Sequence, residues 1–273
     1  MPRFAVEVPL RWGDLDAYGH VNNGAYVDCL QEARVALLLR GPDGTGPVSE
    51  LLGGGVIVAE HQVEHRYSIT DTSAPVEAEL WVEQLGAARF SLGYVLRSGG
   101  REALVARTVA CPYDFTAGRV RRLTGTERDF FASVREEVRA DLRTLPKVSV
   151  EKASEVAEWP LSVRWSDLDS YGHVNNVRFF DYLQEARVRF LDDHLLLIDA
   201  HWVVARQDVK YVDQITHRLQ PYRVRTTVAE VGRSSVQLAA EIDDPDTGRV
   251  FATANTVLVA VDPEGRPVPI NPS

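Results

Sequence analysis

Several residue types that mark specialised proteins are scarce in this sequence. Only two of its 273 residues are cysteines, Cys29 and Cys111, and they do not form a C-x-x-C pair. Two cysteines are too few for a disulfide framework, and without a C-x-x-C pair they do not indicate metal or redox chemistry. We expect both side chains to be buried or half-buried thiols.

Long apolar runs are also absent. No segment approaches the ~18–20 consecutive apolar residues that a membrane-spanning helix needs. The first ten residues, MPRFAVEVPL, have neither the basic region nor the apolar region of a secretory signal peptide. We therefore expect a cytoplasmic protein with no membrane partner.

Positive charge is in deficit. The formal net charge is −9, and lysine occurs only at positions 147, 152 and 210. Proteins that bind nucleic acid need a basic surface to neutralise phosphates. We therefore expect no nucleic-acid partner, and an anionic small molecule would have to meet a local cluster of arginines.

What the sequence does contain is an internal duplication. Residues 11–38 (RWGDLDAYGHVNNGAYVDCLQEARVALL) recur without a gap as residues 164–191 (RWSDLDSYGHVNNVRFFDYLQEARVRFL), with 19 of 28 positions identical. This offset of 153 residues far exceeds the ~20–50 residues of solenoid and propeller repeats, so it indicates two copies of a whole domain. We expect a first domain over residues 1–122, a helical linker over 123–157 and a second domain over 158–273.

Both copies have the same predicted order of elements. A short apolar run is followed by a long helix, because apolar residues recur at i, i+4, i+7 and i+11. These stripes are Tyr26, Leu30, Ala33 and Leu37 in the first copy, and Phe179, Leu183, Ala186 and Phe190 in the second. Alternating and β-branched runs then predict strands near residues 56–69, 76–86, 88–97 and 102–114, and near 201–213, 222–232, 234–243 and 249–261. We expect an α+β fold in which each domain is an antiparallel sheet of about five strands, the last four in a meander, wrapped around one long central helix.

A further helix is predicted between the copies. Residues 126–129 (TERD) can cap it, and Pro146 follows its end. Its apolar residues are Phe130, Phe131, Val134, Val138 and Leu142. We expect this helix to pack on the first domain.

A sheet curled around a single helix leaves one edge strand uncovered. We expect the two copies to pair along these edges, with ligand clefts at the seam, and the tandem unit to form a homo-oligomer.

The most informative segment is a polar motif that occurs once in each copy. It reads D-x-D-x-x-G-H-V-N-N at residues 14–23 and again at 167–176, and it runs into the predicted helix that carries Q-E-A-R. This pattern resembles the 4-hydroxybenzoyl-CoA thioesterase-like family. The resemblance implies a hotdog fold, hydrolysis of an acyl-CoA substrate to the free acid and CoA, and no metal or other cofactor beyond the CoA of the substrate.

The same resemblance gives the catalytic role to the second aspartate of the motif, which is Asp16 in the first copy and Asp169 in the second. A carboxylate just before a helix can attack a thioester carbonyl or deprotonate a water, while the free N–H groups of the helix face the developing oxyanion. The competing interpretation is that these aspartates only hold the loop together. His20 and His173 are further catalytic candidates, and bonding within the loop explains them equally well.

Candidates for substrate binding lie close to the motif. Asn22, Asn23, Asn175 and Asn176 are expected to cap the helix and to shape its anion-friendly end. Tyr26 and Phe179 follow on the helix. Arginines that can meet the phosphates of CoA are Arg66, Arg89, Arg206 and Arg233, although each also fits an ordinary surface charge.

Other polar residues of the repeat fit structural roles better. Asp14 and Asp167 are expected to bond backbone N–H groups of the loop. A solvated or ion-paired helix face explains the charged pairs Glu32 with Arg34 and Glu185 with Arg187 better than catalysis does. A metal site on the motif would lack the further His or Cys that transition metals want. Cys29 is an improbable nucleophile because Tyr182 replaces it in the second copy.

The copies differ where substrate contacts are expected. Residues 86–88 (GAA) in the first copy face residues 232–234 (GRS) in the second. We expect two chemically complete sites of unequal affinity. Two other functions compete with hydrolysis: a non-hydrolytic acyl-CoA binding or sensing module, which the aspartate retained in both copies disfavours, and a hotdog hydratase or dehydratase, whose motif differs.

Overall fold

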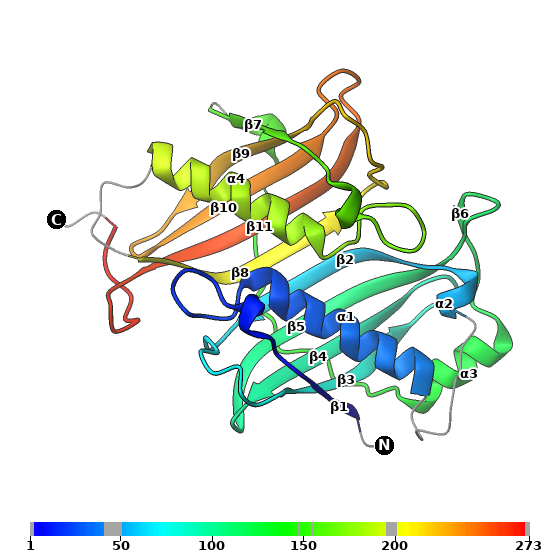
Figure 1. Cartoon of the computed structure of the whole chain (residues 1–273). Coiled ribbons are helices and arrows are strands. Elements are labelled where there is room, and N and C mark those ends of the chain that lie inside the picture. The colour runs from blue at the N-terminus through cyan, green and yellow to red at the C-terminus, as the bar shows by residue number, and fades with distance from the viewer. Residues whose placement is uncertain (1–2, 41–50, 147, 154, 195–200, 271–273) are drawn as a thin grey trace. The chain divides into compact units, whose positions relative to one another are not determined.

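The computed structural model describes residues 3–40, 51–146, 148–153, 155–194 and 201–270 (Figure 1). The chain divides into two compact units, Met1–Arg143 and Thr144–Ser273. Each unit contains one long helix and one antiparallel sheet, with the helix lying across the sheet in Figure 1. The expected tandem arrangement of two α+β hotdog domains is confirmed.

The sheet of the first unit has five main strands in the order β1-β3-β4-β5-β2. They are β1 (Phe4–Val8), β2 (Val56–His65), β3 (Val76–Leu85), β4 (Phe90–Ser98) and β5 (Arg101–Asp114), and the short β6 (Arg119–Val120) pairs with β5. The helices are η1 (Trp12–Asp14), α1 (Asn23–Arg40), α2 (Leu51–Gly54) and α3 (Gly125–Ser133).

The sheet of the second unit repeats this topology in the order β7-β9-β10-β11-β8. Its strands are β7 (Ala157–Leu161), β8 (His201–Tyr211), β9 (Tyr222–Val231), β10 (Ser235–Asp243) and β11 (Val250–Val261). The helices are η2 (Val150–Lys152), η3 (Trp165–Asp167) and α4 (Arg178–His194). Every predicted strand overlaps an observed one.

The expected meander of the last four strands is wrong in both units. Strands β3, β4 and β5 do follow one another through tight turns, but β2 pairs with β5, and β1 occupies the free side of β3. Residues 66–75, which join β2 to β3, are too many for a tight hairpin turn, so the two strands need not be neighbours. This connection returns past the start of α1, where the N–H of Val21 donates to the carbonyl of Ile69 at 2.8 Å.

The apolar stripes of both long helices are buried, as predicted. In the first unit Leu30, Ala33 and Leu37 have no exposed surface and Tyr26 is almost fully covered. In the second unit Phe179, Leu183, Ala186 and Phe190 are buried. Fully burying one large apolar side chain contributes about 1.5–3 kcal/mol, so these stripes are a main source of each domain's stability.

The helix predicted between the copies is shorter than expected and starts differently. Thr124 caps α3, not residues 126–129, because its hydroxyl accepts from the N–H of Glu127 and the Glu127 carboxylate accepts from the N–H of Thr124. The helix ends at Ser133 because the backbone beyond it bonds to β3: the N–H of Val82 donates to the carbonyl of Val134.

The segment that follows α3 lies on the sheet of the first unit. The indole N–H of Trp81 donates to the carbonyl of Val138 at 2.7 Å, and Ala140 packs with Trp81, Val95 and Val105. The predicted packing on the first domain is confirmed, although residues 123–143 join that unit where we expected a separate linker. Among the described residues, no helix combines the length and the apolar character needed to cross a membrane.

Candidate active site

The motif forms a compact loop between η1 and α1. The N–H of Asp16 donates to the carbonyl of His20 at 2.7 Å, and the N–H of Gly19 returns to the carbonyl of Asp16 at 3.0 Å. Gly19 has a φ of 72°, a left-handed conformation that side chains with a Cβ rarely adopt. This explains why glycine stands at that position of the motif.

The second copy folds in the same way. Asp169 donates its N–H to the carbonyl of His173 at 2.8 Å, and Gly172 donates to the carbonyl of Asp169 at 3.0 Å with a φ of 79°. Two segments 153 residues apart in the chain therefore hold their second aspartate in the same backbone frame.

The first aspartate of each motif is a structural residue. Oδ2 of Asp14 accepts from the N–H of Arg11 at 2.7 Å, and Oδ2 of Asp167 accepts from the N–H of Arg164 at 2.8 Å. The expected bond to a backbone N–H is confirmed, although it runs back to the start of the 3-10 helix and not onward as in an Asx turn. In the second copy the buried hydroxyl of Tyr182 also donates to Asp167, at 2.7 Å.

The second aspartate presents one oxygen to the loop. Oδ1 of Asp16 accepts from the N–H groups of Tyr18 at 2.9 Å and His20 at 3.1 Å, and Oδ1 of Asp169 accepts from Tyr171 at 2.9 Å. Within the described part of the chain, no hydrogen bond reaches Oδ2 of either residue. Each carboxylate is thus oriented through one oxygen, and it keeps the other for a further contact.

A helix begins directly after each loop. Oδ1 of Asn22 accepts from the N–H of Gly24 at 2.9 Å, and Oδ1 of Asn175 accepts from Val177 at 3.0 Å. The predicted capping is confirmed for Asn22, whereas the bond that Asn175 accepts comes from Val177, the residue before α4, and shapes the turn that leads into the helix. At α1 the N–H of Asn22 also donates to the carbonyl of Asp14, and at α4 the N–H groups of Arg178 and Phe180 donate to the carbonyls of Asn175 and Val177. The first N–H groups are therefore partly bonded, and the helix dipole is what still favours negative charge at each helix end.

Tyr26 connects this helix to the rest of the site. Its ring contacts His65 edge-on with a centroid distance of 5.0 Å, and its hydroxyl accepts from the N–H of Ile69 at 2.9 Å. Burial, with a small contribution from the charge of Asp16, raises the pKa of Tyr26 to about 12. Phe179 makes the equivalent edge-on contact with Tyr211 at 5.0 Å.

Sequence reasoning missed the contribution of the connection before β3. Ile69 and Ile215 bond to the motif backbone at Val21 and Val174, at 2.8 and 2.9 Å, and both isoleucines are buried. The offset of 146 residues that aligns β2 with β8 also aligns these isoleucines. The signal in the sequence was an isoleucine at the same aligned position of two connecting segments that are otherwise mostly polar.

The other candidates are placed as follows. His20 is half-buried and its backbone N–H bonds to Asp16 in the loop, and the roles of His20, His173, Asn23 and Asn176 stay predictions. Arg233 is exposed at the turn between β9 and β10.

Two of the arginines proposed for CoA phosphates have carboxylate partners. Arg66 pairs with Glu102 at 2.8 Å and with Asp141 at 3.0 Å, and the buried Arg206 pairs with Asp208. Their charge is largely compensated within their own unit.

The interpretation of Arg34 and Arg187 as solvated or ion-paired is wrong. Both are buried, and among the described residues Nη1 of each has no hydrogen-bond partner. Burial lowers the pKa of Arg187 to about 10, so it remains charged at neutral pH. Glu32 and Glu185 are exposed, as a solvated face predicts. The prediction failed because each arginine directly follows a buried alanine of the apolar stripe, Ala33 or Ala186, and lies on the buried side of its helix.

Thiol and metal chemistry find no support in the described residues. Cys29 is buried and Cys111 half-buried, as expected. Burial, together with the neighbouring carboxylates of Asp14 and Asp28, raises the pKa of Cys29 to about 12, so the side chain is a thiol at neutral pH. Within the described ranges, no three His, Cys, Asp or Glu side chains gather in a way that suits a metal ion.

Comparison with known proteins gives one family for both halves. The model of the thioesterase-like superfamily matches residues 10–159 and 163–273. The uncharacterised protein YsmA of Bacillus subtilis (strain 168) is 33% identical over 110 residues, which cover 38% of this chain and 71% of YsmA.

Two solved structures share the tandem fold over almost the whole chain. The 12:0-ACP thioesterase from Umbellularia californica is 18% identical, with a TM-score of 0.73 and 94% of each chain covered. An acyl-ACP thioesterase from Bacteroides thetaiotaomicron is 14% identical, with a TM-score of 0.68, and the match covers 93% of this chain and 97% of that chain.

Proposed function

Because this chain belongs to the thioesterase-like superfamily through both of its halves, we propose that it hydrolyses acyl-CoA thioesters to the free acid and CoA. The observation that carries the proposal is the pair of carboxylates, Asp16 and Asp169. Each has one oxygen held by the backbone of the loop and, among the described residues, no hydrogen bond to the other, and each loop leads into the long helix of its unit.

The chemistry proposed for this arrangement is addition to the thioester carbonyl followed by loss of the thiolate. Either Oδ2 of the aspartate attacks the carbonyl carbon, or it removes a proton from the water that attacks. The carbonyl oxygen gains negative charge, which N–H groups at the start of α1 or α4 stabilise, and the C–S bond then breaks to release CoA as the thiolate. In the first route this leaves a mixed anhydride of the acyl group and the aspartate, which water hydrolyses to the free acid, the restored carboxylate and a proton for the thiolate. In the second route the acid forms directly, and the proton that the aspartate removed from water passes to the thiolate. General-base assistance contributes ~10²–10⁴ in rate.

Neighbouring residues receive supporting roles in the proposal. His20 and His173 contact the thioester or orient the carboxylate. Tyr26 and Phe179 fix the helix against the sheet and border the space for the acyl group, because their rings pack on His65 and Tyr211. Arg233 meets the phosphates of CoA from its exposed turn.

The two sites are proposed to bind substrate unequally. In the first unit Nη1 of Arg128 donates to the carbonyl of Gly86 at 3.0 Å, and the N–H of Leu123 donates to the carbonyl of Ala87 at 2.9 Å. The turn at residues 86–88, which lacks polar side chains, is therefore also in contact with α3 and with the residues that lead into α3. Titration with a non-hydrolysable acyl-CoA is expected to show two affinities, and two equal sites would remove the inequality.

A thiol-release assay tests the activity itself. The full chain is incubated with a series of straight-chain and aryl acyl-CoAs, and free CoA is measured with a thiol reagent. We expect catalytic release of CoA from at least one class of acyl group. Saturable binding of the acyl-CoAs without release would contradict hydrolysis and favour a binding module.

A further inference from the structure

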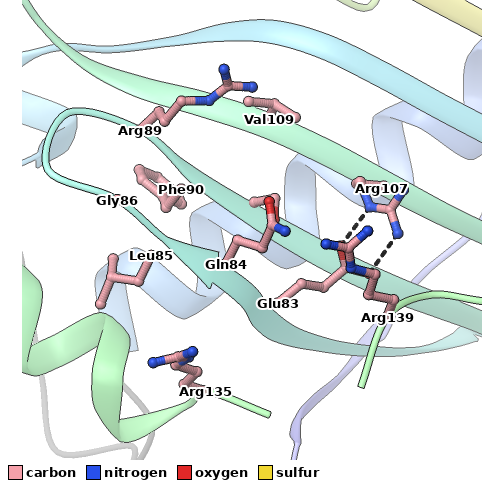
Figure 2. Close-up of a pocket in the computed structure, with 11 residues that line it drawn as sticks. Glu83, Gln84, Leu85, Gly86, Arg89, Phe90, Arg107, Val109, Arg135 and Arg139 are labelled. Atoms are coloured by element: carbon pink, nitrogen blue, oxygen red, sulfur yellow. Dashed lines mark hydrogen bonds and ion pairs between the residues drawn. The ribbon is translucent and has the colours of Figure 1, made fainter. Parts of the chain in front are cut away.

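A concave site lies on the first unit, away from the motif. It is a cavity of about 540 Å³ lined by residues of β3, β4 and β5 and of the segment after α3 (Figure 2). That size falls within the ~300–1,000 Å³ of pockets that hold small molecules.

The cavity opens on the face of the sheet opposite α1. Side chains of a strand alternate between faces, and His65 of β2 points toward α1 because its ring contacts Tyr26. Gln62 has the opposite parity, and it accepts from Nη1 of Arg107 in the cavity at 3.0 Å. The cavity and the Asp16 loop therefore belong to different faces of the unit.

The floor of the cavity is a fixed ion pair. The Glu83 carboxylate is buried and accepts from Nε of Arg107 at 2.5 Å and from the N–H of Ala140 at 2.5 Å. Arg107 is thus held on two sides, by Glu83 and Gln62, and its charge is compensated by Glu83.

The remaining charges around the cavity are all positive. Arg89 precedes β4, while Arg135 and Arg139 come from the segment after α3, and Figure 2 shows the three side chains at separate places along the lining. Arg135 has a distant partner, the exposed Glu137 at 3.7 Å. In the described part of the chain, the side chains of Arg89 and Arg139 have neither a hydrogen bond nor a carboxylate partner.

This local charge is opposite to that of the whole chain. Four arginines and one glutamate line the cavity, a surplus of three positive charges, whereas the chain carries −9. Positive side chains gathered in a concave site of an acidic protein attract an anion more strongly than scattered surface charges do.

Among the described residues of the second unit, the charged positions of this cavity are not repeated. By strand register, Ser235 stands in the place of Arg89, Ala229 in that of Glu83 and Asn255 in that of Arg107. The segment that carries Arg135 and Arg139 is outside the duplicated strands and helix. The cavity is therefore not part of the duplicated catalytic machinery.

We propose that this cavity binds a nucleoside diphosphate group. Arg89, Arg135 and Arg139 are separate donors that suit the several oxygens of a diphosphate, because a guanidinium binds phosphate through two parallel hydrogen bonds. The half-buried Leu85 offers an apolar surface for the nucleoside, while the other apolar lining residues, Phe90 and Val109, are almost fully covered. The same group occurs in free nucleotides and at the end of CoA, so the ligand is either a separate nucleotide or the far end of the proposed substrate.

Calorimetric titration of the full chain tests the binding. We expect inorganic pyrophosphate and ADP to bind the wild type, and the double variant Arg89→Ala/Arg139→Ala to bind both at least about tenfold more weakly. Arg119→Ala, a substitution of an exposed arginine of the same unit outside the cavity, is the matched control and keeps the wild-type affinity. No binding of either probe, or equal affinity in the double variant, would overturn the proposal.

Two substrates distinguish the sources of the nucleotide. If the cavity holds the end of CoA, the double variant raises KM for an acyl-CoA but not for the corresponding acyl-pantetheine, which lacks the nucleotide. If it holds a separate nucleotide, both KM values stay unchanged while ADP binding is still lost. The titration does not require hydrolysis, so failure of the proposed function leaves this result interpretable.

Discussion

At the scale of single residues, the two aspartates of the motif have different surroundings. Asp14 and Asp167 bond backward to the start of the 3-10 helix, whereas Asp16 and Asp169 bond forward into the loop and keep one oxygen open. The same residue type therefore serves structure at one position and, in our proposal, chemistry two residues later.

The hydroxyl of Tyr182 gives a direct measure of the structural role of Asp167. Burial and this hydrogen bond raise the pKa of Tyr182 well above its ordinary value, so the group remains a donor. Tyr182→Phe is expected to reduce the free energy of unfolding by about 1.5–3 kcal/mol, the range for bonds to a charged acceptor. Urea denaturation measures the change.

Tyr94→Phe is the matched control. The hydroxyl of Tyr94 is buried and, among the described residues, has no partner, so its removal is expected to leave stability unchanged or to increase it. A larger loss for Tyr94→Phe than for Tyr182→Phe would contradict the assigned bond.

Asp244 predicts a pH dependence of stability. Hydrogen bonds from Arg218 at 2.8 and 3.1 Å, and from the N–H of Asp246 at 3.0 Å, lower the pKa of Asp244 to about 2 from 3.8. Because the folded pKa is the lower one, the stabilisation is complete above the unfolded pKa and is lost as the pH falls toward 2.

The thermal midpoints of wild type and Asp244→Asn measure this effect. We expect the wild type to melt at the higher temperature at pH 7 and the difference to shrink between pH 4 and pH 2. Asp246→Asn, which keeps the backbone N–H, serves as control and shows no such trend. A constant difference over the whole pH range would contradict the assigned partners.

At the scale of elements, local patterns predicted type and position well. The helix stripes from Tyr26 and Phe179 and the eight strands after them follow from periodicity, which reports the buried face of each element. The pairing of β2 with β5 was out of reach, because alternation within a strand carries no information about its neighbour.

The site was predicted in part for a similar reason. The bonds that the side chains of Asn22 and Asn175 accept from nearby N–H groups are contacts within a few residues of the chain, and such contacts follow from residue type and spacing. The burial of Arg34 and the contact between Ile69 and Val21 depend on how distant segments pack, which no local pattern shows.

Helix α3 offers a paired test of its start. Thr124→Ala removes the oxygen that accepts from the N–H of Glu127, so we expect a loss of about 1 kcal/mol in the free energy of unfolding. Thr126→Ala, within the segment that the sequence favoured as the cap, is exposed and is expected to change stability little. Equal losses in urea denaturation would be inconsistent with the cap at Thr124.

At the scale of the whole molecule, duplication supplies two copies of one loop, one helix and one sheet, and divergence then separates them. Tyr182 replaces Cys29 beneath the loop, and residues 134–143, which follow α3, pack on the first sheet. The arginine-lined cavity is a product of that divergence. Pairing of the two domains along their edge strands remains a prediction from the sequence.

The central claim is that Asp16 and Asp169 carry out the hydrolysis. Asparagine is the right replacement, because its side-chain oxygen can still accept from the N–H groups of residues 18, 20 and 171 and preserve the loop. Glu32→Gln/Glu185→Gln, a double substitution of exposed helix carboxylates, is the matched control and is expected to keep full activity.

The most direct measurement is kcat for CoA release by the wild type, by Asp16→Asn, by Asp169→Asn and by the double variant, with circular dichroism to check the fold. We predict that each single variant retains the part of kcat that its unchanged site contributes, and that kcat of the double variant falls by a factor of ~10²–10⁴. A folded double variant with wild-type kcat would contradict the assignment of these two aspartates.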